Sequence, residues 1–142
     1  KCRDYAEKGG HLLAMTMAFS RDEWGSGIFE KSPVGMTDFF GMHVVEMEPV
    51  FDGQTDAPVR IGELTIRSHF WQETLESEGA EVLGVFRGTY RDGWPVLTEH
   101  PYGKGSALYL GTAPAPEDAP ALLRWRKAPG TSRAIPPRAA AV

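Results

Sequence analysis

The sequence predicts an α/β fold, built as one domain around a single sheet. The first third of the chain alternates helical and strand-like segments, an order that indicates a parallel sheet covered by helices. The remainder is a series of short apolar segments separated by glycine- or charge-rich turns, which indicates an antiparallel extension of the sheet. A chain of 142 residues has the size of one domain with one hydrophobic core.

The alternating part has clear helix and strand boundaries. Gly9 and Gly10 end the first helix, because glycine adopts the left-handed conformation of a helix C-terminus at little cost. The apolar run HLLAMTMAF that follows predicts a strand buried on both faces. Pro33 suits the first turn of the next helix, and Pro49 ends the next strand. The predicted order is a helix over 1–8, a strand over 11–19, a loop over 20–31, a helix over 32–40 and a strand over 42–50.

The antiparallel part ends in a helix. Glu117 and Asp118 suit the first turn of a helix over residues 116–126, where negative charge is favoured. Residues 127–142 are rich in proline and alanine without an apolar period, and we expect a disordered tail or linker there. The predicted strands cover 61–67, 69–75, 80–86, 95–99 and 106–110.

The run Gly103-Lys104-Gly105-Ser106 raises the question of a phosphate-binding loop. Such a loop needs a glycine five positions before its Gly-Lys pair and a serine or threonine directly after the lysine. Here Thr98 and Gly105 occupy those two positions, and the next residues read as a strand rather than as a helix. The run therefore predicts a hairpin turn and not a nucleotide site.

Composition narrows the classes of partner. A net charge of -4 argues against nucleic acid or an anionic membrane as the main partner. No apolar run approaches the ~20 residues that span a bilayer. The single Cys2 excludes an internal disulfide framework.

Because the chain begins at Lys1 within a helical pattern, we expect it to be a piece of a longer polypeptide.

Three groups of carboxylates are candidates for glycosidase chemistry, which in retaining enzymes uses two carboxyl groups ~5–5.5 Å apart. All are also typical of solvated surfaces and ion pairs, and nothing in the sequence builds a substrate pocket around them. We therefore expect no catalytic residue among them. The groups are Asp22 with Glu23, Glu46 with Glu48, and Glu73 with Glu76 and Glu78.

Nucleophilic and metal chemistry have weaker support. Cys2 lies in a predicted helix, and Ser20 lacks the flanking glycines of a nucleophile elbow. The four histidines are widely spread and none pairs at a metal-ligand spacing, so we expect no metal site and no cofactor.

The loop after the first strand is a candidate interface or cleft loop. It places Trp24 after Asp22 and Glu23, and Phe29 follows a Gly-Ser-Gly run. A tryptophan on such a loop stacks on a sugar ring, anchors a subunit contact or folds back on the core. We expect this loop to lie at a subunit interface or beside a cleft.

Several segments, in their order along residues 1–112, resemble the middle domain of glycoside hydrolase family 42 β-galactosidases, which is called the trimerisation domain. The segments are YAEKGGHLLAMT, the acidic loop at Ser20–Glu23, TDFFGM (37–42) with Glu46 and Glu48-Pro49, Trp71-Gln72-Glu73 with GAEVL (79–83), and YGKG before the strand that ends in Leu-Gly-Thr.

The resemblance implies a three-layer fold like that of class I glutamine amidotransferases (flavodoxin-like), without an amidotransferase active site. Residues 1–126 would form this domain, incomplete at its N-terminal end. Its role would be assembly of a cytoplasmic homotrimer. A TIM barrel on the same polypeptide would hold the two catalytic glutamates and hydrolyse terminal β-D-galactosides. No catalytic, cofactor-binding or metal residue transfers to this chain. A stand-alone amidotransferase-like hydrolase and a sugar-binding module stay open as alternatives.

Overall fold

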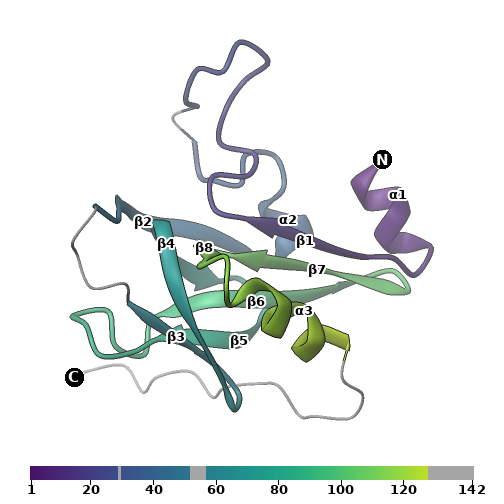
Figure 1. Ribbon diagram of the computed structural model, residues 1–142. Coiled ribbons are helices and arrows are strands. Elements are labelled where there is room, and N and C mark those ends of the chain that lie inside the picture. The colour runs from purple at the N-terminus through teal and green to yellow at the C-terminus, as the bar shows by residue number, and fades with distance from the viewer. Residues whose placement is uncertain (29, 52–56, 128–142) are drawn as a thin grey trace.

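The computed structural model describes residues 1–28, 30–51 and 57–127. Within those ranges the chain forms one eight-stranded mixed sheet with helices against both faces, and a long loop stands away from the sheet (Figure 1). The predicted α/β class is therefore confirmed. None of the helices in these ranges has the length and apolar character needed to span a bilayer.

Strands dominate the described residues, with two short helices near the start and one at the end. The strand order in the sheet is β1-β7-β6-β5-β3-β4-β2, and β8 pairs with β4. The elements are α1 (Cys2–Glu7), β1 (His11–Met15), α2 (Thr37–Phe40), β2 (Met42–Pro49), β3 (Pro58–Ile61), β4 (Leu64–Ser77), β5 (Glu81–Phe86), β6 (Pro95–Tyr102), β7 (Gly105–Leu110), β8 (Thr112–Pro114) and α3 (Ala119–Lys127).

The two faces of the sheet carry separate apolar clusters, because successive residues of a strand point to opposite faces. In β7, Ala107 and Tyr109 belong to the cluster that α1 and α2 cover. Leu108 and Leu110 belong to the cluster that α3 covers through Leu122. Helices therefore cover both faces of the sheet.

Three predictions about the first strands are wrong. The first strand is not buried on both faces, because His11, Leu13 and Met15 on one face of β1 are exposed. The strands predicted over 11–19 and 42–50 are not parallel neighbours: β1 pairs in parallel with β7, and β2 pairs antiparallel with β4 at the far edge. β1 also ends early, because Met17 and Phe19 adopt left-handed backbone conformations with φ of 64° and 57°, which turn the chain out of the sheet.

The middle of the chain also differs from the prediction. Instead of two strands, residues 64–77 form one bent strand that passes from its partner β3 to its partners β8 and β2. The bend lies at Phe70, where φ is 62° and the pairing register with β8 is irregular. Helix α2 begins at Thr37, so Pro33 lies before it and not in its first turn.

The closing segments agree better with the sequence. Tyr102 pairs with Gly105 across a two-residue turn, which confirms the hairpin prediction for the Gly-Lys-Gly run. Helix α3 forms near the predicted place and includes Lys127. The rest of the predicted tail, residues 128–142, lies outside the described residues.

Candidate functional site

The loop between β1 and α2 begins with a small hairpin that carries the predicted interface residues. Arg21 and Gly27 form an antiparallel bridge. Oδ1 of Asp22 accepts hydrogen bonds from the backbone N–H groups of Trp24 (3.0 Å) and Ser26 (2.8 Å). Such bonds are typical of an Asx turn, in which a side chain replaces a backbone partner. Hydrogen bonds within the hairpin therefore stabilise it.

Trp24 stands near the tip of this hairpin and is 85% exposed. Glu23 beside it is exposed as well. Figure 1 shows the loop that carries this hairpin projecting away from the sheet. An exposed indole on an ordered turn favours contact with another surface. Phe29, the remaining residue predicted for this site, lies outside the described residues.

Glu46 and Glu48 share one face of β2, as predicted, and both meet a buried arginine. Arg91 lies in the turn between β5 and β6 and has no exposed surface. Its Nη2 lies 3.4 Å from Oε1 of Glu46, and its Nη1 lies 3.3 Å from Oε1 of Glu48. Nη1 also donates a hydrogen bond to Oε1 of Gln72 (3.2 Å). The two carboxylates are therefore ion-pair partners of one guanidinium, not an acid and a nucleophile facing a cavity.

The three carboxylates of the third group, Glu73, Glu76 and Glu78, lie in different surroundings. Glu73 is 1% exposed, and burial raises the pKa of its carboxyl group. Glu76 is exposed, and Glu78 lies 2.8 Å from Nδ1 of His43. These side chains do not converge on one place, so they provide no pair for glycoside hydrolysis.

A hydrogen-bonded chain that sequence reasoning missed runs across one end of the sheet. Oγ of Ser106 donates to Oε1 of Glu99 (2.6 Å) and lies 2.8 Å from Nδ1 of His11. Arg126 of α3 contacts the same oxygen of Glu99 at 3.0 Å. In a catalytic triad the imidazole lies between hydroxyl and carboxylate, whereas here the hydroxyl lies in the middle. These hydrogen bonds therefore join β1, β7, β6 and α3 and do not activate a nucleophile.

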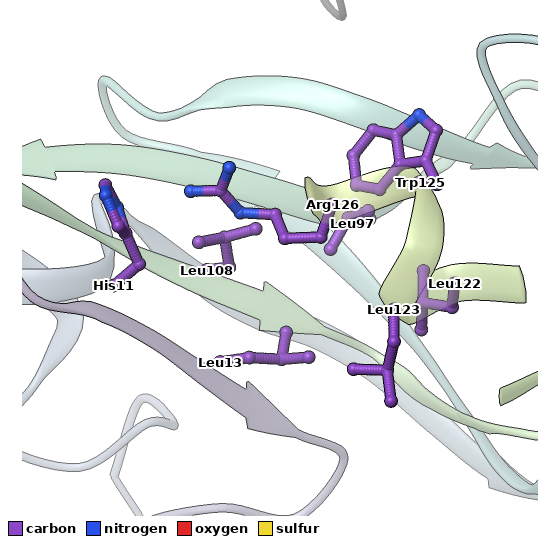
Figure 2. Close-up of a pocket in the computed structure, with 8 residues that line it drawn as sticks. All are labelled: His11, Leu13, Leu97, Leu108, Leu122, Leu123, Trp125 and Arg126. Atoms are coloured by element: carbon purple, nitrogen blue, oxygen red, sulfur yellow. The ribbon is translucent and has the colours of Figure 1, made fainter. Parts of the chain in front are cut away.

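An apolar pocket of about 200 Å³ lies beside this chain, between α3 and the β1 end of the sheet. Figure 2 shows the leucine side chains around it, with His11 and Arg126 at one end. Leu13 of β1 is 40% exposed and Leu123 of α3 is 57% exposed, so the pocket is bordered by apolar groups that face outward. Its lining residues are His11, Leu13, Leu97, Leu108, Leu122, Leu123, Trp125 and Arg126.

The candidate nucleophiles do not have the setting of a nucleophile elbow. Cys2 is half-buried in the first turn of α1, not on a turn from strand to helix. Oγ of Ser20 donates to the backbone oxygen of Met17 (2.6 Å). In the part of the chain that the structure describes, no group of three or more His, Cys, Asp and Glu side chains could hold a metal ion.

The comparison of sequences identifies a family. Residues 1–128 match the β-galactosidase trimerisation domain. The β-galactosidase LacZ of Heyndrickxia coagulans is 31% identical over 124 residues, which is 87% of this chain and 18% of that protein. The β-galactosidase BgaB of Geobacillus sp. is 29% identical over 113 residues, 79% of this chain and 16% of that protein. The chain thus spans less than a fifth of these relatives.

Solved structures show the same fold. A β-galactosidase from Bacillus circulans sp. alkalophilus superposes with a TM-score of 0.78 at 18% identity, over 87% of this chain and 19% of the other. A β-galactosidase from the haloarchaeon Halorubrum lacusprofundi gives a TM-score of 0.77 at 24% identity, over 87% of this chain and 18% of the other. With the match of residues 1–128, these findings place the chain in the family of β-galactosidase trimerisation domains.

Proposed function

We propose that this chain is the assembly domain of a homotrimeric β-galactosidase and that the Trp24 hairpin is one of its subunit contacts. The observation that carries the second part is the 85% exposure of Trp24 on a hairpin closed by its own hydrogen bonds. Tryptophan is enriched at the centre of protein interfaces because it brings a large apolar area at a small cost in conformational entropy.

Trimer geometry supports this role for a projecting loop. A cyclic trimer has no two-fold axis, so its contacts join two different surfaces of adjacent subunits. A hairpin that stands away from the sheet can reach such a surface on a neighbour without requiring the sheets to meet. Asp22 and Glu23 beside the indole would then contribute to the polar rim of the contact.

Membership of the same family supports a proposal for the chemistry of the parent polypeptide. We propose that a TIM barrel outside this chain hydrolyses terminal β-D-galactosides in the cytoplasm. The three-layer arrangement supports a domain like that of class I glutamine amidotransferases, and the roles of Glu46, Glu48 and Arg91 as ion-pair partners support an assembly function without local catalysis.

The test is Trp24→Ala in the full-length polypeptide, followed by sedimentation equilibrium. If the indole is a central contact, each of the three equivalent subunit contacts weakens about 30-fold, which corresponds to about 2 kcal/mol per contact. Tyr5→Ala is the matched control, because Tyr5 is an exposed aromatic residue (56%) on α1. An unchanged dissociation constant for Trp24→Ala would contradict the role of the hairpin, and a monomeric wild type would contradict assembly itself.

A further inference from the structure

The loop that carries Trp24 leaves the sheet through residues whose backbone conformation is unfavourable. We call it the Trp24 loop: it connects β1 to α2 over residues 16–36, of which residue 29 is not described. Met17 and Phe19 at its start have φ of 64° and 57°. Side chains other than glycine rarely adopt this region, because Cβ approaches the following carbonyl oxygen. Such a conformation persists only where the surroundings hold it.

A buried carboxylate holds Met17 in this conformation. Oε1 of Glu73 in β4 accepts a hydrogen bond from the backbone N–H of Met17 (2.8 Å). Oε2 of the same group accepts one from the hydroxyl of Tyr109 in β7 (2.9 Å). Glu73 is 1% exposed and Tyr109 is fully buried. One carboxylate therefore joins two strands to the first residues of the Trp24 loop.

The surroundings of Glu73 indicate why a carboxylate stands there. Among the ion pairs of the described residues none involves Glu73, and burial raises its pKa, so the site disfavours negative charge. A buried acid without a cationic partner is expensive unless its oxygens are hydrogen-bonded. Here both oxygens have a donor.

Fixing Met17 also fixes the outgoing end of the loop. The N–H of Val34 donates to the backbone oxygen of Phe19 (2.8 Å), so the two stems of the loop are joined two residues after Met17. The ring of Phe19 lies 5.9 Å from that of Phe40 in α2. Glu73 and Phe40 are thus two points at which the stems are attached to the rest of the domain.

We infer that Glu73 is a positioning residue: its carboxylate sets the direction in which the Trp24 loop leaves the sheet, and thereby the orientation of Trp24. The inference about the loop stands on the geometry alone. Its consequence for assembly rests on the proposed function.

The first experiment measures hydrogen exchange by mass spectrometry in the full-length polypeptide carrying Glu73→Leu. We expect peptides from residues 16–28 to exchange at least about tenfold faster, because leucine removes both acceptors, while peptides from β6 and β7 stay unchanged. Glu73→Gln should stay within about threefold of wild type, because its amide oxygen accepts from Met17 and its amide nitrogen donates to Tyr109.

The matched control is Gln72→Leu. Gln72 is the neighbouring buried residue of β4, but its side chain contacts Ser68 and Arg91. We expect this variant to destabilise the domain without faster exchange in the Trp24 loop. If Glu73→Leu does not fold, Tyr109→Phe removes one donor to the same carboxylate and should raise loop exchange about threefold.

The second experiment is a double-mutant cycle on the dissociation constant of the trimer. Because Glu73 acts through the loop, Glu73→Leu combined with Trp24→Ala should weaken assembly no more than Trp24→Ala alone. Additive effects, faster exchange spread evenly over all peptides, or unchanged exchange in the loop would each overturn the inference. If Trp24→Ala leaves assembly unchanged, the proposed contact fails, while the exchange data still decide the role of Glu73.

Discussion

Arg91 and Glu48 form an ion pair in which one partner is fully buried and the other is not: Nη1 of Arg91 lies 3.3 Å from Oε1 of Glu48, whose side chain is 43% exposed. The pair ties the turn between β5 and β6 to the edge strand β2, and Glu46 adds a second carboxylate at 3.4 Å. A guanidinium without exposed surface depends on such partners, because burying an unpaired charge is expensive.

Arg91→Ala should therefore lower the free energy of unfolding by about 3 kcal/mol, at the lower end of the range for breaking a buried ion pair, because the released carboxylates can regain water. Arg87→Ala is the control: Arg87 lies nearby and pairs with Asp92 at the surface. We expect it to change stability by no more than about 0.5 kcal/mol. Urea unfolding followed by circular dichroism measures both, and equal losses would contradict the importance of burial.

Asp22→Ala should weaken trimer assembly, because it removes the acceptor that orders the Trp24 backbone while leaving the indole in place. We expect each subunit contact to weaken about fivefold, since losing a cap-type hydrogen bond costs about 1 kcal/mol. Asp22→Asn keeps an oxygen at the same place and should restore wild-type assembly. Sedimentation equilibrium distinguishes them, and equal effects of both substitutions would show that charge, not turn geometry, is what Asp22 supplies.

Gly105→Ala should destabilise the domain by about 2 kcal/mol or more, because a Cβ there would collide with the backbone oxygens of Gly10 and Ala6. Lys104→Ala, one position earlier in the β6–β7 turn, should change stability by less than about 0.5 kcal/mol. Thermal unfolding of the two variants tests the turn directly. A large loss of stability for Lys104→Ala with a small loss for Gly105→Ala would mean that the lysine, and not the glycine, maintains the shape of this turn.

The stability of the domain should depend on pH through the protonation of Glu73. Its pKa is raised in the folded state above the unfolded value of 4.5, mainly by burial. The stabilising contribution of its protonation is therefore fully present below pH 4.5 and is lost as pH rises through the folded pKa. The difference in Tm between wild type and Glu73→Gln should thus become less favourable to wild type as pH increases from 4.5 upward. Calorimetry of both proteins across that range checks the sign, and a difference that is constant with pH would refute it.

Local signals in the sequence predicted the elements that depend on local structure. The strand ended by Pro49 and the turn at Gly103 are found as expected, because proline and glycine restrict or permit particular backbone conformations. The first helix is found as well, followed by Gly9 with φ of 105°. These features need no knowledge of distant residues.

Features that depend on distant residues could not be predicted in this way. The bend at Phe70 has no local signal, because phenylalanine does not favour a positive φ. Arg91 lies in a polar, glycine-containing stretch that reads as an exposed turn, and its burial follows from carboxylates about 45 residues away. For the candidate site, the sequence pointed to the loop of Trp24, which stays a prediction. It gave no sign of the hydrogen bond from Met17 to Glu73, since that bond joins residues 56 positions apart that only the whole fold brings together.

The pairing of β1 with β7 has a consequence for the order of events during synthesis. His11 and Ser106, which face each other in this parallel pair, are 95 residues apart in the chain. At the usual rate of 5–20 residues per second, the ribosome delivers β7 roughly 5 to 20 s after β1. Throughout that interval the apolar segment HLLAM has no strand partner in β7. β1 is therefore translated before every other strand of the described sheet, yet can join that sheet only after β7 has emerged.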